Sequence, residues 1–96
     1  MSRFDALKAK RDEILRIAAK HGARNVRIFG SVARGDCRLD SDVDFLVAMD
    51  ADRSLLDHAA LLVELEGLLG CTVDVAPEDA LRPRFKERIL KEALPL

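Results

Sequence analysis

The sequence predicts an α/β fold, with a small mixed three-stranded sheet flanked by helices in the order α-β-α-β-α-β-α. Residues 2–22 and 53–70 repeat apolar residues at helical spacing, and three short β-branched runs alternate with helical segments. Residues 42–76 read as strand, helix and strand, an order that forms a right-handed parallel crossover. The length of 96 residues predicts a single domain over residues 1–96.

The first helix and the first strand come before a short turn. Ser2 and Asp5 resemble a capping box at the start of the helix, and Gly22 supplies its stop. Residues 25–30 form a β-branched and aromatic run that predicts a strand. Because its link to the next strand is too short for a crossover, these two strands should be antiparallel.

The second strand, residues 42–49, is the clearest in the chain. Its alternation places Val43 and Phe45 on a core face and Asp42 and Asp44 on the opposite, accessible face. The two aspartates then point to the same side, about 7 Å apart at the backbone.

The second long helix begins after Ser54 and has a wide apolar surface between Leu55 and Leu69. This surface exceeds one core-facing stripe and predicts self-association, as a homodimer, or docking of a partner. Residues 71–76 are the third strand. A last helix is expected to start at Pro83.

Charge is unevenly distributed although the net charge is only −1. Residues 3–38 and 81–96 are basic and residues 39–66 are acidic, which suits a phosphate-bearing ligand and its metal.

No signal peptide or long apolar run is present, so we expect a cytoplasmic protein without a membrane partner. Cys37 and Cys71 lack metal-ligand neighbours and are expected to be free thiols.

One short motif carries the chemistry: Gly30-Ser31, ten further residues, then Asp42 and Asp44 one position apart. Gly30 allows the backbone to approach a phosphate closely, and Mg²⁺ sits between carboxylates and substrate phosphates. A third strand parallel to the second would bring Asp74 beside the pair. Three carboxylates around a phosphate describe a two-metal phosphoryl-transfer site.

The stretch "GSVARGDCRLDSDVDFLV" resembles the signature of the minimal nucleotidyltransferases, within the DNA polymerase beta-like superfamily. The resemblance implies the polymerase beta-like nucleotidyltransferase fold, with ATP as substrate and two Mg²⁺ ions that Mn²⁺ can replace. It also implies that Gly30 and Ser31 hold the nucleotide's phosphates and that Asp42 and Asp44 bind the metals. Asp74 would help to bind metal or deprotonate the acceptor hydroxyl.

Two further residues are candidates for nucleotide binding. Arg34 can donate two hydrogen bonds to a phosphate, or it is a solvated loop residue. Ser41 supports the site by a hydrogen bond near Asp42, or it only starts the strand.

Small members of this family are similar to the antitoxins of HEPN/MNT toxin–antitoxin pairs, which transfer AMP from ATP to a tyrosine of a ribonuclease toxin. The resemblance therefore implies a HEPN-type toxin as partner. No direct nucleic-acid binding is expected, because 96 residues offer too little surface for a duplex. One alternative is transfer to a small molecule, although 96 residues leave little room to enclose one. Another is a binding module that neutralises a toxin without chemistry.

Overall fold

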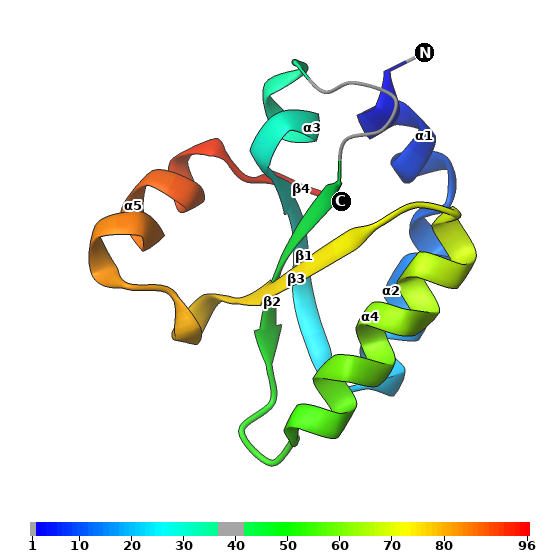
Figure 1. Cartoon of the computed structure of the whole chain (residues 1–96), viewed down its shortest axis with the longest axis vertical. Coiled ribbons are helices and arrows are strands. Elements are labelled where there is room, and N and C mark those ends of the chain that lie inside the picture. The colour runs from blue at the N-terminus through cyan, green and yellow to red at the C-terminus, as the bar shows by residue number, and fades with distance from the viewer. Residues whose placement is uncertain (1, 37–41) are drawn as a thin grey trace.

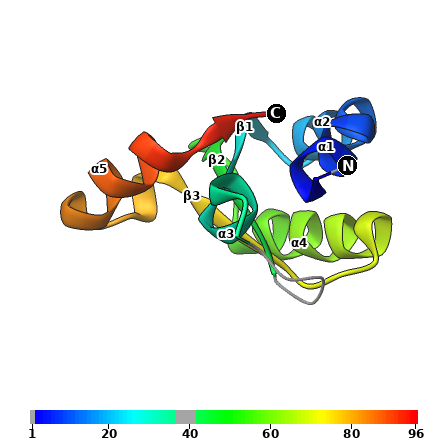
Figure 2. The same cartoon turned by 90° about the horizontal axis from the view of Figure 1, so that it is seen from above.

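Four strands form one mixed sheet, with helices on both of its sides (Figure 1). The computed structural model describes residues 2–36 and 42–96. In chain order the elements are α1 (Arg3–Ala9), α2 (Arg11–Lys20), β1 (Ala23–Phe29), α3 (Gly30–Arg34), β2 (Val43–Met49), α4 (Leu55–Leu69), β3 (Val73–Pro77), the 3₁₀ helix η1 (Glu78–Ala80), α5 (Pro83–Glu92) and β4 (Leu94–Pro95). Figure 2 shows α1, α2 and α4 on one side of the sheet and α5 on the other.

The sheet has the order β3-β2-β1-β4. β1 pairs antiparallel with β2, and β2 pairs parallel with β3, which confirms both predicted pairings. On β2, Asp44 lies opposite Phe29 of β1 and opposite Asp74 of β3. The fourth strand, β4, was not predicted, because a two-residue strand has no alternation to recognise. The prediction of three strands is corrected to four.

The main core lies between the sheet and helices α1, α2 and α4. Val43, Phe45 and Val47 are buried in it, as the alternation of the second strand predicts. The opposite face of β2 is less accessible than expected, because Leu46 is fully buried and Asp44 is half-buried. The physical reason is that η1 packs against β2 and α5 lies on the same side of the sheet.

The helix ends agree with the sequence except in one place. Ser2 accepts a hydrogen bond from the Asp5 amide, but the expected single helix is divided at Lys10 into α1 and α2. The division lies beside Arg11, which interrupts the apolar stripe and donates to the carbonyl of Leu96 at 2.9 Å. α4 begins after Ser54 and α5 begins at Pro83, both as predicted, and Ser54 forms a capping box with Asp57.

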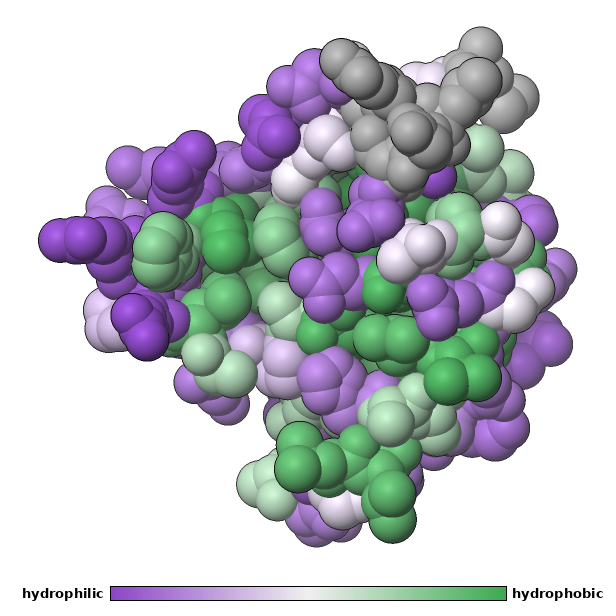
Figure 3. All heavy atoms as spheres, in the orientation of Figure 1, coloured by the Kyte–Doolittle hydropathy of each residue, from purple (hydrophilic) through white to green (hydrophobic). Residues whose placement is uncertain are grey.

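The apolar surface of α4 is only partly covered. Leu61 and Leu65 are buried, whereas Leu55 and Leu56 are 85% and 80% exposed. Figure 3 shows hydrophobic side chains gathered at the lower end of the molecule, over the first turn of α4. Within residues 2–36 and 42–96, no helix has both the length and the apolarity to span a membrane.

A shielded ion pair between Arg27 and Glu78 ties β1 to η1. The Arg27 guanidinium lowers the pKa of Glu78 below its ordinary value. We expect Glu78→Gln to lower the free energy of unfolding by about 1 kcal/mol, because Arg27 loses its charged partner. A lowered pKa stabilises the fold above the ordinary carboxyl range, so the difference from wild type should shrink as the pH falls through that range.

Chemical denaturation at pH 7 and at pH 3.5 measures this difference. The matched control is Glu87→Gln, which breaks a fully solvated pair with Lys91. That variant should change the unfolding free energy by less than about 0.5 kcal/mol. Equal effects of the two substitutions would show that the Arg27–Glu78 pair contributes nothing through its burial.

Candidate active site

Gly30 begins α3 directly after β1 and cannot carry a side chain. Its φ of 74° lies in the left-handed region, which strongly favours glycine. A Cβ atom on Gly30 would also overlap Oδ2 of Asp44. The backbone at the start of α3 therefore lies directly against the Asp44 carboxylate, and Ser31, half-buried, follows it.

Asp42, Asp44 and Asp74 lie where the parallel strands β2 and β3 begin. Asp44 and Asp74 are direct neighbours across the parallel β2–β3 pairing. Asp42 is exposed, directly precedes β2 and is two residues before Asp44, so the two belong to the same face of the strand. The predicted neighbouring positions of Asp44 and Asp74 are found in the structure, whereas Asp42 lies just before β2 and Asp44 is half-buried and not fully accessible.

The carboxylates repel one another, and this repulsion changes the pKa of Asp44. The pKa of Asp44 is raised to about 6, chiefly by burial and then by the charges of Asp74 and Asp42. Arg34 opposes the rise, and Glu92 adds to it. At neutral pH the site therefore holds anions that a bound cation would stabilise.

Removal of the central charge should stabilise the protein when no metal is present. A carboxyl whose pKa is raised by folding stabilises the fold below its unfolded pKa, and this contribution is lost as the pH rises through about 6. We expect Asp44→Asn to raise the free energy of unfolding at pH 7.5 by about 1 kcal/mol, after allowance for solvent screening. The gain should vanish near pH 4.

Thermal unfolding in the presence of EDTA at the two pH values measures this gain. Asp50→Asn, at the other end of β2 where Asp50 pairs with Arg24, is the matched control. It should show no such pH-dependent gain. An Asp44→Asn variant that fails to fold would show that the carboxylate is structural.

The residue types at this site suit a hard divalent cation. Carboxylate oxygens are the ligands of Mg²⁺, which typically takes one or two carboxylates and completes its coordination with substrate phosphates. Within the described residues, no three carboxylate, thiol or imidazole side chains converge closely enough to chelate an ion by themselves. Asp44 and Asp74 are oxygen ligands of the type that Mg²⁺ prefers, but the protein side chains described here would need ligands from a bound molecule to complete a coordination shell.

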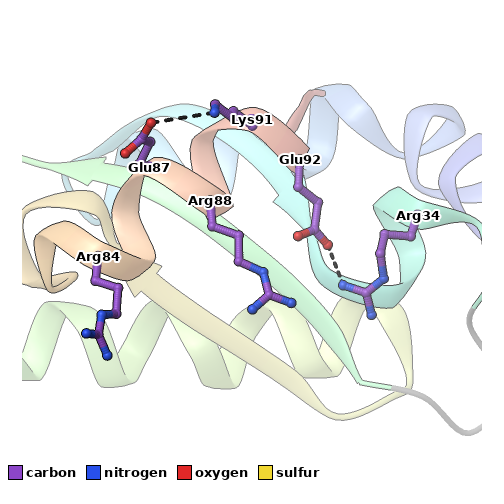
Figure 4. Close-up of a pocket in the computed structure, with 6 residues that line it drawn as sticks. All are labelled: Arg34, Arg84, Glu87, Arg88, Lys91 and Glu92. Carbon is purple, nitrogen blue, oxygen red and sulfur yellow. Dashed lines mark hydrogen bonds and ion pairs between the residues drawn. The ribbon is translucent and has the colours of Figure 1, made fainter.

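Arg34 connects this site to α5. At the end of α3 its Nε donates to Asp36 Oδ2 at 3.2 Å and its Nη1 donates to Glu92 Oε1 (Figure 4). Asp36 and then Glu92 raise the pKa of Arg34 above its already high value. Arg34 lies in α3, its side chain is exposed, and its guanidinium pairs with these two carboxylates.

The sequence did not predict that residues of α5 lie beside the candidate site, as Glu92 does where it pairs with Arg34. The basic character of residues 81–96 was visible, but their position beside α3 follows from the tertiary fold. Two other predictions are not tested by the structure, since Ser41 and Cys37 lie outside the described residues. Cys71 is a free thiol, as expected.

Comparison with known proteins gives consistent matches. The sequence profile of the nucleotidyltransferase domain family matches residues 11–96. A Methanocaldococcus jannaschii protein named as a candidate protein adenylyltransferase, MJ0435, is 44% identical over 82 residues, which cover 85% of this chain and 88% of that protein. Protein adenylyltransferase MntA of Thermococcus cleftensis is 37% identical over 75 residues, covering 78% and 76% respectively.

Solved structures share the same architecture. One described as a candidate minimal nucleotidyltransferase superposes with a TM-score of 0.88 at 53% identity, covering 100% of this chain and 97% of the other. The crystal structure of a toxin–antitoxin with AMP-PNP superposes with a TM-score of 0.75 at 16% identity, covering 88% and 69%. At this lower identity the likeness shows the fold alone.

Proposed function

Because this chain belongs to the nucleotidyltransferase domain family, we propose that it is a metal-dependent protein adenylyltransferase that serves as an antitoxin. It would transfer AMP from ATP to a tyrosine hydroxyl of a partner HEPN ribonuclease toxin. The main observation in support is that the backbone of Gly30 lies directly against the Asp44 carboxylate, and that Asp74 is the neighbour of Asp44 on β3. Relatives named as protein adenylyltransferases and a toxin–antitoxin of the same fold support it.

The proposed reaction is an in-line displacement at the α-phosphorus of ATP. The tyrosine oxygen forms a bond to that phosphorus, the bond to the bridging oxygen breaks, and pyrophosphate leaves with the electron pair. The hydroxyl proton passes to a carboxylate, and Asp74 suits this role because it is exposed beside Asp44. Gly30 and Ser31 would hold the phosphates, since only a residue without a side chain fits against Asp44.

The carboxylates Asp42, Asp44 and Asp74 would hold two Mg²⁺ ions, for which Mn²⁺ can substitute. Bound there, the ions would neutralise the phosphate charges and relieve the repulsion that raises the pKa of Asp44. Asp44 would contribute most to this site, because it neighbours Asp74 across the β2–β3 pairing and lies against the backbone of Gly30.

A protein acceptor suits the exposed position of Asp74 better than an enclosed small molecule. A docked protein can present a hydroxyl at an open edge, because the interface and not a pocket provides the positioning.

We further propose that the exposed first turn of α4 is available for self-association, and that the reaction takes place in the cytoplasm. Residues 1–96 would form the single catalytic domain.

The direct test is to incubate the protein with ATP, Mg²⁺ and a candidate HEPN ribonuclease partner, and to measure intact masses. The partner should gain one or a few AMP units on tyrosine and lose ribonuclease activity. The chain itself contains no tyrosine, so tyrosine-linked AMP reports on the partner alone. Omission of the divalent metal should prevent the gain.

Asp74→Asn is the variant that separates the competing functions. If the wild-type protein suppresses the ribonuclease stoichiometrically with no gain in mass, and Asp74→Asn suppresses it equally well, the protein is a binding module. If the partner is unchanged but a small-molecule hydroxyl is adenylylated, the acceptor proposal is wrong while the reaction class stands.

A further inference from the structure

Helix α4 has an exposed face that carries no charge. This face, called the α4 face below, consists of the exposed residues Leu55, Leu56, Ala59, Val63 and Gly67. Among the described residues, its two leucines and its valine are the most exposed large hydrophobic side chains, and Val63 is 64% exposed. Figure 3 shows a hydrophobic surface over the part of the molecule that the first turns of α4 occupy in Figure 1. Because the opposite side of the helix packs in the core, α4 is apolar all round, which is typical of a helix that is covered on both sides.

The charged residues of α4 that flank this face have partners within the chain. Glu64 accepts a hydrogen bond from Lys20 Nζ at 2.9 Å and also pairs with His21. Glu66 Oε2 accepts a hydrogen bond from the Val73 amide at 3.1 Å. The face between the two glutamates therefore presents uncharged groups alone. A partner must offer an uncharged surface as well, since a charge buried against this face would lose its water without gaining a counter-charge.

The sheet edge beside α4 is not open to a second strand. β3 is an edge strand, but His58 Nε2 of α4 lies 2.9 Å from the Val75 carbonyl oxygen. Glu66 already accepts from the Val73 amide, and Pro77 has no N–H to donate. Strand pairing at β3 would have to break these contacts, so this edge is protected against sheet extension. The α4 face is the surface that remains for association on this side.

Gly67 has no role in the folded chain that requires a glycine. It is not among the glycines with positive φ, and a Cβ atom there would meet no described atom within 4 Å. A glycine inside a helix lowers stability relative to alanine. The space above Gly67 is therefore kept free at a cost in stability, which a partner surface entering that space would explain.

We propose that the α4 face is a two-fold interface between two copies of this chain, with the two α4 helices antiparallel. An axis midway between Ala59 and Val63 sets Ala59 of each copy against Val63 of the other. The same axis sets Leu55 of each copy over the free space at Gly67 of the other, so a larger side chain meets a smaller one at each position. A parallel pair would oppose leucine to leucine at one end and leave a gap between glycines at the other.

The inference rests on the self-association proposed above and does not depend on AMP transfer. α4 has 15 residues, so the face is about 22 Å long and about 10 Å wide. This area is smaller than the roughly 800 Å² per partner of a standard interface, so the dissociation constant should lie in the micromolar range. The face lies on the side of the sheet opposite α5, so pairing leaves the α5 side open in both copies.

Sedimentation of the full chain from about 1 µM to about 1 mM measures this association. We expect a reversible dimer, and we expect Val63→Lys to weaken it at least about 100-fold because a lysine would be buried against an uncharged face. Leu90→Lys is the matched control, since Leu90 is a 40% exposed hydrophobic residue on α5. That variant should dimerise as the wild type does. Circular dichroism verifies that each variant is folded.

Gly67→Leu tests the orientation of the two helices. Leucine is a better helix former than glycine, so the midpoint of chemical denaturation should not fall. The dimer should nevertheless weaken about ten-fold or more, because the new side chain occupies the space that Leu55 of the second copy needs. Addition of Leu55→Ala to the same chain should restore much of the lost affinity. A dimer that is weakened but not restored would show that Leu55 does not face Gly67.

The inference is overturned if the wild type is monomeric over the whole concentration range, or if Val63→Lys dimerises equally well. It is also overturned if Val63→Lys weakens only a complex with a HEPN protein, since the face would then dock that partner. Failure of the proposed function is a different result. The wild type would then dimerise and lose its dimer on Val63→Lys substitution, while neither protein transfers AMP.

Discussion

Asp44→Asn is expected to reduce AMP transfer at least about 1,000-fold while leaving the protein folded. Asp44 lies directly opposite Asp74 in the β2–β3 pairing and against the backbone of Gly30. An amide has the same shape but no charge, so it cannot neutralise a divalent cation or keep it between the phosphates. The loss should therefore appear in kcat, because the asparagine side chain fills the same space and only the charge is missing.

Single-turnover assays with saturating ATP and partner measure this loss. Asp50→Asn is again the matched control, and its transfer rate should remain within about two-fold of wild type. A folded Asp44→Asn protein that transfers AMP at a tenth of the wild-type rate would remove Asp44 from the metal site. Raised concentrations of Mn²⁺ should not restore full activity, because the proposed metal ligand has lost its negative charge.

Gly30→Ala is expected to reduce transfer about 100-fold and to lower the unfolding free energy by about 1–2 kcal/mol. Two separate effects add. The φ of 74° disfavours any Cβ, and the added methyl group would overlap Oδ2 of Asp44. The Asp44 carboxylate or the start of α3 must therefore move, which shifts the backbone that we propose to hold the phosphates relative to the carboxylates.

Gly70→Ala separates these two effects. Gly70 ends α4 with a φ of 67°, but a Cβ there meets no atom within 4 Å. This variant should lose about 1 kcal/mol of stability and keep its transfer rate. Denaturation curves and transfer rates for both variants give the comparison. Equal rates for Gly30→Ala and wild type would show that the close approach to Asp44 has no role in the reaction.

The sequence contained most of the site because strand alternation is a local rule. A period of two fixes Asp42 and Asp44 on one face, and the crossover brings Asp74 beside them without any knowledge of side-chain packing. The resemblance of the motif to nucleotidyltransferases is confirmed by the family to which the chain belongs. The roles of the individual residues remain predictions.

What the sequence could not show depends on contacts between distant segments. The cations of α5 are visible as a pattern, but their place beside Arg34 depends on how α5 packs after η1. The burial of Leu46 has the same origin, because the alternation alone assigns it to the accessible face. The pairing of β4 with β1 rests on two residues, too few to carry a periodic signal.

The parallel pairing of Asp44 with Asp74 makes the site sensitive to chain length as well as to composition. The segment between these strands, including all of α4, acts as a spacer that decides which residue of β3 lies beside Asp44. Loss or gain of one residue at the start of β3 would place Val73 or Val75 there, and would turn Asp74 toward the core. Insertions and deletions in this part of the gene should therefore be selected against more strongly than most substitutions.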